Sequence, residues 1–171
     1  TRRSSDLIQY VKGESLQWWW NDRLLRYLHT NAGFYPPTVE KIEQFCELML
    51  EDMKELDVLG SWLGLESFFE KELKNVGKVN LELLNPYFSK TPWTKALEGR
   101  KVLVVHPFAE TIKTQYTKRD LLFSNNILPE FELQTVKAIQ SLAGEKTEFN
   151  DWFDSLEYMK SEIDKHDYDV C

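Results

Sequence analysis

The chain has 171 residues, of which 42% are hydrophobic and 29% charged, with a formal net charge of −7. The apolar content is enough for a globular core, which excludes a disordered chain. The acidic balance disfavours a nucleic-acid partner, whose phosphates need a Lys/Arg-rich face. No apolar run approaches the roughly 20 residues of a membrane span. Two cysteines, Cys46 and Cys171, cannot form a disulfide framework, which favours a reducing, cytoplasmic setting.

Helices are expected in residues 1–56. Apolar residues from Ser15 to Leu28 share one helical face. The loop after them contains Gly33 and two prolines, which interrupt helices. A second helix is expected to begin after Thr38, a residue type that caps helix N-termini. Its apolar positions recur at spacings of three and four: Val39, Ile42, Cys46, Met49, Met53 and Leu56, with Phe45 widening the stripe.

Strand and helix patterns alternate in residues 57–171, which is typical of βαβ units. Strands are predicted at 57–60, 78–84, 101–105 and 131–139, with a further one starting at 168–171. A helix is predicted around 65–73, with Gly77 closing it, and another from a Thr91-Pro92 cap to Gly99. Two further helices are predicted, one from Ala109 to about Lys118 and one after a Thr147 cap.

The sequence therefore predicts a single α/β domain over residues 1–171, with a Rossmann-like, open and mainly parallel sheet behind an N-terminal helical segment. The continuous apolar run 101–105 is typical of a strand covered on both faces. The chain lacks an initiator Met, and "HDYDVC" at its end resembles the first half of a strand. We expect from this that it is a fragment of a longer protein.

The first candidate site follows strand 101–105, because open α/β sheets bind ligands at the carboxyl ends of their strands. A helix starting there would offer the backbone N–H groups of 108–111 to a phosphate or carboxylate. His106 and Lys113 would add a hydrogen bond and a charge. Glu110 in the first turn opposes an anion, and no glycine allows close approach. The alternative is that His106 only caps the strand end and packs under the helix. The residues concerned are His106, Phe108, Ala109, Glu110, Thr111 and Lys113.

The second candidate is the loop "LHTNAGFYPP" at 28–37, which combines aromatic and amide side chains. Sugars are bound by such combinations, with a ring against the sugar face and polar groups on its hydroxyls. Asn31, Phe34 and Tyr35 are the expected contacts. The alternative is an ordinary interhelical loop whose aromatic residues join the two helices.

Two tryptophan-containing stretches are further candidates. If strand 57–60 lies parallel to strand 101–105, Trp62 opens on the same sheet edge as His106 and lines the same pocket. In "QWWWND" at 17–22, three adjacent tryptophans cannot all face one side of a helix. We expect Trp19 and Trp20 in the core and Trp18 at solvent or at a partner surface.

Several known motifs are absent, so the sequence assigns no catalytic or metal-binding residue. Phosphate-binding loops, dinucleotide fingerprints and the G-x-S-x-G elbow do not occur. The carboxylates at 51–57 and 151–157 have the spacing of solvated helix faces. "DYD" at 167–169 precedes a predicted strand, whereas a metal-binding D-x-D of a glycosyltransferase would follow one.

The chain resembles, over nearly its whole length, a family of largely uncharacterised proteins associated with polysaccharide-biosynthesis genes. The resemblance is most specific in the stretches "NAGFYP" and "VVHPFAETI". That family in turn resembles GT-D-type glycosyltransferases. The resemblance implies a Rossmann-like fold and a nucleotide-activated sugar as substrate, with Mn²⁺ or Mg²⁺ as the accompanying metal. Two motifs of the resembling enzymes, an acidic Asp-x-Glu-like motif and a Gly-rich strand-turn, are not in this chain.

The leading hypothesis is a glycosyltransferase-like core with a nucleotide sugar and a glycan acceptor as partners. His106 and the backbone at 108–111 would then face the donor diphosphate. Asn31, Phe34, Tyr35 and Trp62 would line the sugar or acceptor side. One rival hypothesis is a non-catalytic binding or scaffold domain that docks a partner through its Trp-rich N-terminal helix. Another is a different enzyme on the same sheet, because fold does not fix function.

Overall fold

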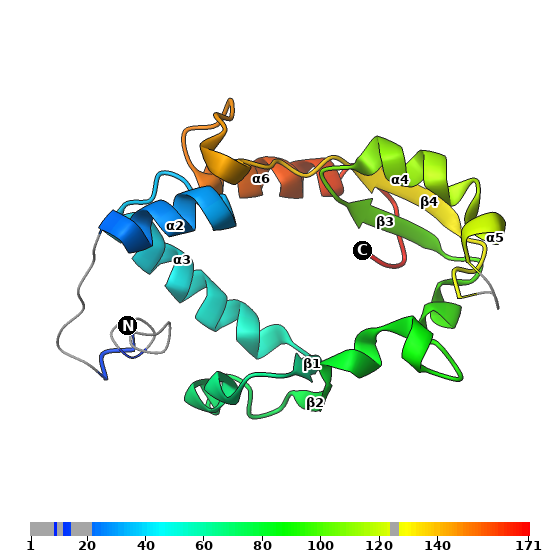
Figure 1. The fold of residues 1–171 in the computed structure, drawn as a ribbon, viewed down its shortest axis with the longest axis horizontal. Coiled ribbons are helices and arrows are strands. Elements are labelled where there is room, and N and C mark those ends of the chain that lie inside the picture. The colour runs from blue at the N-terminus through cyan, green and yellow to red at the C-terminus, as the bar shows by residue number, and fades with distance from the viewer. Residues whose placement is uncertain (1–8, 10–11, 15–21, 124–126) are drawn as a thin grey trace.

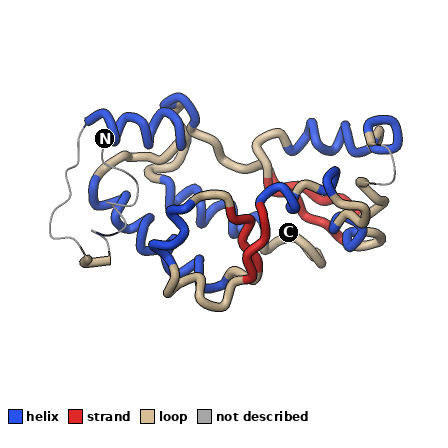
Figure 2. Tube along the Cα trace, turned by 60° about the horizontal axis from the view of Figure 1, so that its bottom comes forward, coloured by secondary structure: helices blue, strands red, loops and turns tan. Residues whose placement is uncertain are grey.

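A computed structural model of the chain describes residues 9, 12–14, 22–123 and 127–171. The backbone traces a loop in space (Figure 1). α3 (Val39–Asp52) leads from a helical cluster to the strands β1 (Val58–Ser61) and β2 (Gly77–Asn80), and residues 81–97 lead on to β3 (Lys101–Val105) and β4 (Glu132–Val136). The segment after β4 returns to the helical cluster, and α6 (Trp152–Ile163) leads from there back towards β3. Strands are confined to two short pairs, with helix and loop elsewhere in the described chain (Figure 2). None of the described helices combines the length and apolarity needed to cross a bilayer.

The N-terminal helical segment contains α2 (Asp22–Ala32) and α3 (Val39–Asp52). The Thr38 hydroxyl accepts a hydrogen bond from the Lys41 amide at 3.4 Å, which confirms the predicted N-cap. α2 runs to Ala32, beyond the predicted end at Leu28. Residues 15–21, with the three tryptophans, lie outside the described residues. After α3 the helix tightens into a short 3₁₀ turn, η1 (Met53–Glu55).

β1 (Val58–Ser61) and β2 (Gly77–Asn80) form a parallel pair, joined through the 3₁₀ helix η2 (Gly64–Phe69). Gly77 does not end a helix as predicted. Its N–H donates to the Asp57 carbonyl at 2.8 Å, so it opens β2 instead. The strand predicted at 78–84 stops at Asn80, because the Asn80 side chain accepts from the Glu82 amide and turns the backbone into η3 (Leu81–Leu84).

Short 3₁₀ helices fill the connection to β3: η4 (Pro86–Phe88) and η5 (Trp93–Leu97). The predicted cap Thr91 is wrong. Pro92 occupies the N-cap position of η5, and the Thr91 N–H instead donates to the Ser89 hydroxyl at 3.2 Å. Gly99 does end this segment as predicted, with a φ of +69° that favours glycine.

The second parallel pair joins β3 (Lys101–Val105) and β4 (Glu132–Val136), with α4 (Ala109–Tyr116) and α5 (Arg119–Leu122) between them in sequence. On the other side of β3, Val102 forms a parallel bridge with Val170. β3 is therefore flanked on both edges, and Leu103 within it is only 1% exposed. The strand predicted at 101–105 is confirmed.

The chain is mixed α/β with parallel strand pairs, as predicted, but β1 and β2 do not join the β3–β4 pair among the described residues. β1 and β2 each end after four residues. The predicted common sheet edge for Trp62 and His106 is therefore not formed.

α6 (Trp152–Ile163) begins at Asp151, whose carboxylate accepts from the Asp154 amide at 2.9 Å. The predicted cap Thr147 is wrong, because its hydroxyl donates to the Tyr35 hydroxyl at 2.7 Å. The Asp151 carboxylate also lies 2.6 Å from the Lys41 ammonium on α3. One carboxylate thus caps α6 and pairs with α3.

An aromatic cluster fills the space between α3, α6 and the loop at 33–38. Phe34, 5% exposed, lies with its ring centroid 5.4 Å from Phe45 and 5.8 Å from Trp152. Phe153 completes the cluster at 6.3 Å from Phe34, and the Lys41 ammonium lies 5.2 Å above its ring. The Tyr35 carbonyl accepts from the Trp152 amide at 2.7 Å, which fixes the loop on the first turn of α6.

We expect Asp151→Ala to lower the free energy of unfolding by about 1 kcal/mol, because the N-cap of α6 is lost. Asp151→Asn is the matched control, since asparagine caps helices about as well as aspartate while losing the charge. Urea unfolding of both variants measures the difference. Equal destabilisation by Ala and Asn would contradict a capping role.

The Asp151 carboxyl should also make the stability of the protein depend on pH. The hydrogen bond from Lys41 is the main cause that lowers the pKa of Asp151 below its usual value. A lowered folded-state pKa stabilises the protein above the unfolded-state pKa of about 3.9. This contribution is lost as the pH falls through the folded-state pKa. The stability difference between the unmodified protein and Asp151→Asn should therefore shrink below about pH 4. A constant difference down to pH 2 would refute this.

Candidate functional site

The carboxyl end of β3 runs directly into α4 through His106 and Pro107. The His106 amide donates to the Val136 carbonyl at 3.0 Å and so extends the pairing with β4 by one residue. The exposed His106 imidazole accepts from the Phe108 amide through Nδ1 at 3.1 Å, so the neutral ring carries its proton on Nε2. His106 therefore stabilises the turn before α4, but its exposed ring does not pack under the helix, so only the first part of the alternative interpretation agrees with the structure.

The amide groups at the start of α4 are only partly available to an anion. The Phe108 amide is held by His106, and the Ala109 amide donates to the His106 carbonyl at 3.2 Å. Ala109 itself is 3% exposed. The amides of Glu110 and Thr111 have no backbone partner outside α4 among the described residues. Glu110 pairs with Lys113 at 2.9 Å, and both side chains point into solvent.

A pocket of about 510 Å³ lies at the carboxyl ends of β3 and β4. Two of its walls follow these strands, at 107–108 and at 137–140, and a third comes from the segment 145–149 before α6. Its volume is within the range of small-molecule sites, roughly 300–1,000 Å³. The pocket lies where ligands bind in parallel α/β sheets, and Phe108 is the predicted contact that lines it.

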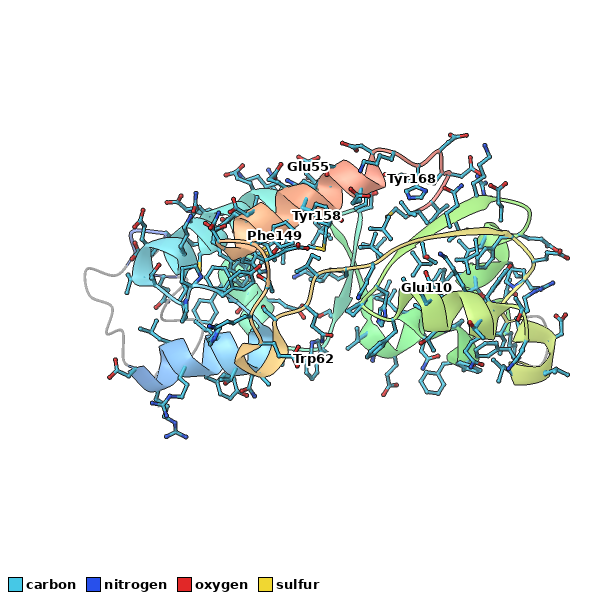
Figure 3. The ribbon with its side chains drawn as sticks, turned by 90° about the horizontal axis from the view of Figure 1, so that it is seen from above. Glu55, Trp62, Glu110, Phe149, Tyr158 and Tyr168 are labelled. Carbon is cyan, nitrogen blue, oxygen red and sulfur yellow. The ribbon has the colours of Figure 1, made fainter. Side chains whose placement is uncertain are left out.

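The pocket combines charged and aromatic side chains. Lys137 and Lys146 contribute two ammonium groups, and Glu145 and Glu148 contribute two carboxylates. Phe108 is 63% exposed beside it. On the opposite wall Phe149 packs on Tyr158 of α6 with ring centroids 5.0 Å apart, as Figure 3 shows. The aromatic rings offer flat apolar surface, and the charged groups of both signs can pair with a charged ligand.

A second pocket of about 130 Å³ adjoins the first, and the two share Ile139 and Gln140 as lining residues. Tyr35 lines the second pocket, so one residue of the predicted 28–37 site lies next to the pocket at the strand ends. Its hydroxyl is hydrogen-bonded to Ser155 of α6 and to Thr147.

The other predicted contacts lie elsewhere. Phe34 is buried in the aromatic cluster, which agrees with the alternative interpretation of its loop. Asn31, exposed at the end of α2, accepts from the Thr30 hydroxyl at 2.9 Å. Trp62 is 72% exposed and lies apart from Glu110 of α4 (Figure 3). The Trp62 amide donates to the Glu66 carboxylate. Hydrogen bonds received by this carboxylate, chiefly from the Ser61 hydroxyl, lower the pKa of Glu66.

Sequence reasoning missed the walls at 137–140 and 145–149. The strand predicted at 131–139 extended too far, since β4 ends at Val136. The loop at the carboxyl end of β4 was therefore counted as strand, although the rule that ligands bind at the carboxyl ends of strands applies to it as well. Residues 145–149 carry no local signal of this kind, because they reach the pocket only through the packing of α6.

The described residues contain no group of three or more His, Cys, Asp or Glu side chains that could hold a metal ion. Comparisons of the chain with models of known protein families, with curated proteins and with solved structures find no match.

Phe34→Ala should lower the free energy of unfolding by about 3–5 kcal/mol, because a buried aromatic side chain leaves a cavity. Chemical denaturation measures this loss. Phe88, which is 65% exposed, is the matched control, and Phe88→Ala should change stability by less than about 0.5 kcal/mol. A Phe34→Ala protein as stable as Phe88→Ala would mean that Phe34 is not a core residue.

Proposed function

We propose that the chain is the nucleotide-sugar-binding part of a glycosyltransferase-like enzyme. The observation that carries this proposal is the 510 Å³ pocket at the carboxyl ends of the parallel strands β3 and β4, with two lysines and two phenylalanines on its walls. A nucleotide sugar has the matching features: a flat base, a diphosphate and a sugar.

The strand order supports a Rossmann-like open sheet around this pocket. β4 lies on one side of β3, and Val170 lies on the other. α4 connects β3 to β4, and α6 leads from β4 back towards Val170. The chain thus changes direction across the sheet at β3. In doubly wound sheets ligands bind outside the carboxyl ends of the strands, and the pocket lies at the carboxyl ends of β3 and β4.

The two ammonium groups of the pocket can contact a diphosphate, while Glu145 and Glu148 balance their charge. Ammonium groups form charge-assisted hydrogen bonds with phosphate oxygens, so Lys137 and Lys146 are the proposed diphosphate contacts. Phe108 and Phe149 offer flat apolar surfaces to the base. His106 in this proposal is a positioning residue, because its Nδ1 holds the turn that presents Phe108.

The same lysines have a role in transfer. When a glycosyl group moves to an acceptor hydroxyl, the acceptor oxygen bonds the anomeric carbon and releases its proton to solvent. The bond between the anomeric carbon and the diphosphate oxygen breaks, and the diphosphate leaves with both bonding electrons. Negative charge therefore grows on the leaving oxygen. Fixed positive groups stabilise that charge more in the transition state than in the substrate, and this lowers the barrier.

Isothermal titration against UDP- and GDP-linked hexoses, with and without Mn²⁺, tests the proposal. We expect at least one nucleotide sugar to bind the unmodified protein. The double variant Lys137→Ala/Lys146→Ala should bind it roughly tenfold more weakly or worse, because two charged hydrogen-bonding groups are lost.

The matched control is Lys90→Ala/Lys95→Ala, which removes two exposed lysines that do not line the pocket. Its affinity should equal that of the unmodified protein. The proposal fails if a well-folded sample binds no nucleotide sugar, or if both double variants lose affinity equally.

A further inference from the structure

An exposed apolar surface surrounds the 3₁₀ helix η3. Three of the four residues of this helix are leucines, and all three are exposed, although leucine is a residue type that proteins usually bury. Three aromatic residues from the flanking segments are more than half exposed. We call these six residues the η3 surface: Trp62, Leu81, Leu83, Leu84, Tyr87 and Trp93. Exposed apolar side chains concentrated in this way are typical of an interaction surface.

The η3 surface is fixed on β1 by close packing. Leu81 and Leu84, three residues apart, lie on the same side of a 3₁₀ helix. Both pack so closely on Gly60 of β1 that a Cβ atom there would lie 2.8 Å from Leu81 Cδ1 and 2.6 Å from Leu84 Cδ1. Trp62 follows two residues after Gly60. The Trp93 indole N–H donates to the Leu84 carbonyl at 2.8 Å, which joins η5 to η3. The exposed side chains therefore stand on one fixed backbone framework.

The area of the η3 surface is enough for a weak dimer. An aromatic side chain has roughly 200 Å² of surface and a leucine side chain roughly 100 Å², so the exposed parts of the six side chains amount to about 500 Å². Two copies that face each other would bury about 1,000 Å², which is the lower limit for a specific protein–protein interface. The area therefore fits a reversible dimer better than a permanent one.

The charge of this region favours a second copy of the chain as the occupant. Residues 57–100 contain six acidic and six basic residues, so their net charge is zero, and the rest of the chain carries the whole net charge of −7. Two such neutral surfaces can meet without electrostatic repulsion, since a net charge near zero promotes association. An anionic bilayer would instead attract a cluster of lysines and arginines, and it would repel the acidic remainder of the chain.

We propose that the η3 surface is the interface of a homodimer, in which η3 of one copy packs against η3 of the other about a two-fold axis. In such a dimer the same patch is buried on both copies, so the patch must be complementary to itself, as an apolar and neutral surface is. β1 and β2, beside η3, lie on the opposite side of the molecule from α4 and α6 (Figure 1). The dimer therefore leaves the larger pocket open, and this inference is independent of the proposed function.

Sedimentation velocity over a range of protein concentrations tests the dimer. The unmodified chain should show a monomer–dimer equilibrium with a Kd of roughly 1–100 µM, as expected for an interface of this size. Leu83→Glu places a carboxylate in the apolar interface of both copies. Because a buried charge without a partner is strongly unfavourable, this variant should raise the Kd of the dimer about tenfold or more.

A second variant and a matched control separate the interface from other effects of the added charge. Trp62→Glu changes the opposite end of the η3 surface and should raise the Kd of the dimer in the same way. Tyr27→Glu adds the same charge at an exposed residue of α2, outside the η3 surface, and should leave the Kd unchanged. Circular dichroism checks that all three variants are folded. An equal rise in Kd for all three would refute the assignment of the interface.

Salt and lipid vesicles distinguish the apolar dimer from the alternatives. The dimer should persist in about 0.5 M NaCl, since salt at this level screens charge pairs and not apolar contacts. Dissociation of the dimer by this salt would contradict an apolar interface. A chain that stays monomeric up to about 500 µM, well above the expected Kd, would overturn the proposal. If that monomer binds vesicles of phosphatidylcholine and phosphatidylserine through Trp62 and Leu83, the η3 surface contacts lipid instead of a second copy.

Discussion

The packing of Phe34 against Phe45, Trp152 and Phe153 is the contact on which the rest of the structure depends. It joins α3, near the start of the described chain, to α6, near its end. The Lys41–Asp151 pair closes the same junction from the polar side. Because α6 follows β4 and leads to Val170 beside β3, fixing its N-terminal end also fixes the segment that precedes it. That segment, 145–149, is a wall of the larger pocket.

Side-chain caps at the ends of short segments limit the length of the strands in this chain. Asn80 and Asn85 each turn the backbone into a 3₁₀ helix by accepting from an amide two residues ahead. This local bond competes with continued strand pairing. The β1–β2 pair consequently remains separate from β3–β4 within the described residues, and the candidate site is built on the second pair alone. His106 acts in a similar local way, since its ring holds an amide of its own turn.

The two pockets divide the polar groups by type. The larger one has exposed charges, whereas the smaller one has buried hydroxyls and an amide. Charges near water can approach a diphosphate with little loss of hydration. Buried hydroxyls are instead costly without a partner, and those of the smaller pocket are hydrogen-bonded within the protein. The division follows from the fold: the charges lie on loops, and the hydroxyls lie between α6 and the loop at 33–35.

The sequence by itself determined the local elements: the Thr38 cap, the stop at Gly99, the parallel strand 101–105 and the helix after it. Each depends on neighbours within a few residues, whose chemistry is legible from their order. It also indicated the correct sheet edge for a pocket, since the strand-end rule needs only strand and direction. Tertiary structure alone decided that Phe34 is core, that β1 pairs only with β2, and that Tyr35 meets Ser155, 120 residues away. These outcomes depend on contacts between distant segments, and their register and packing are set by how whole elements fit together, which no local pattern encodes.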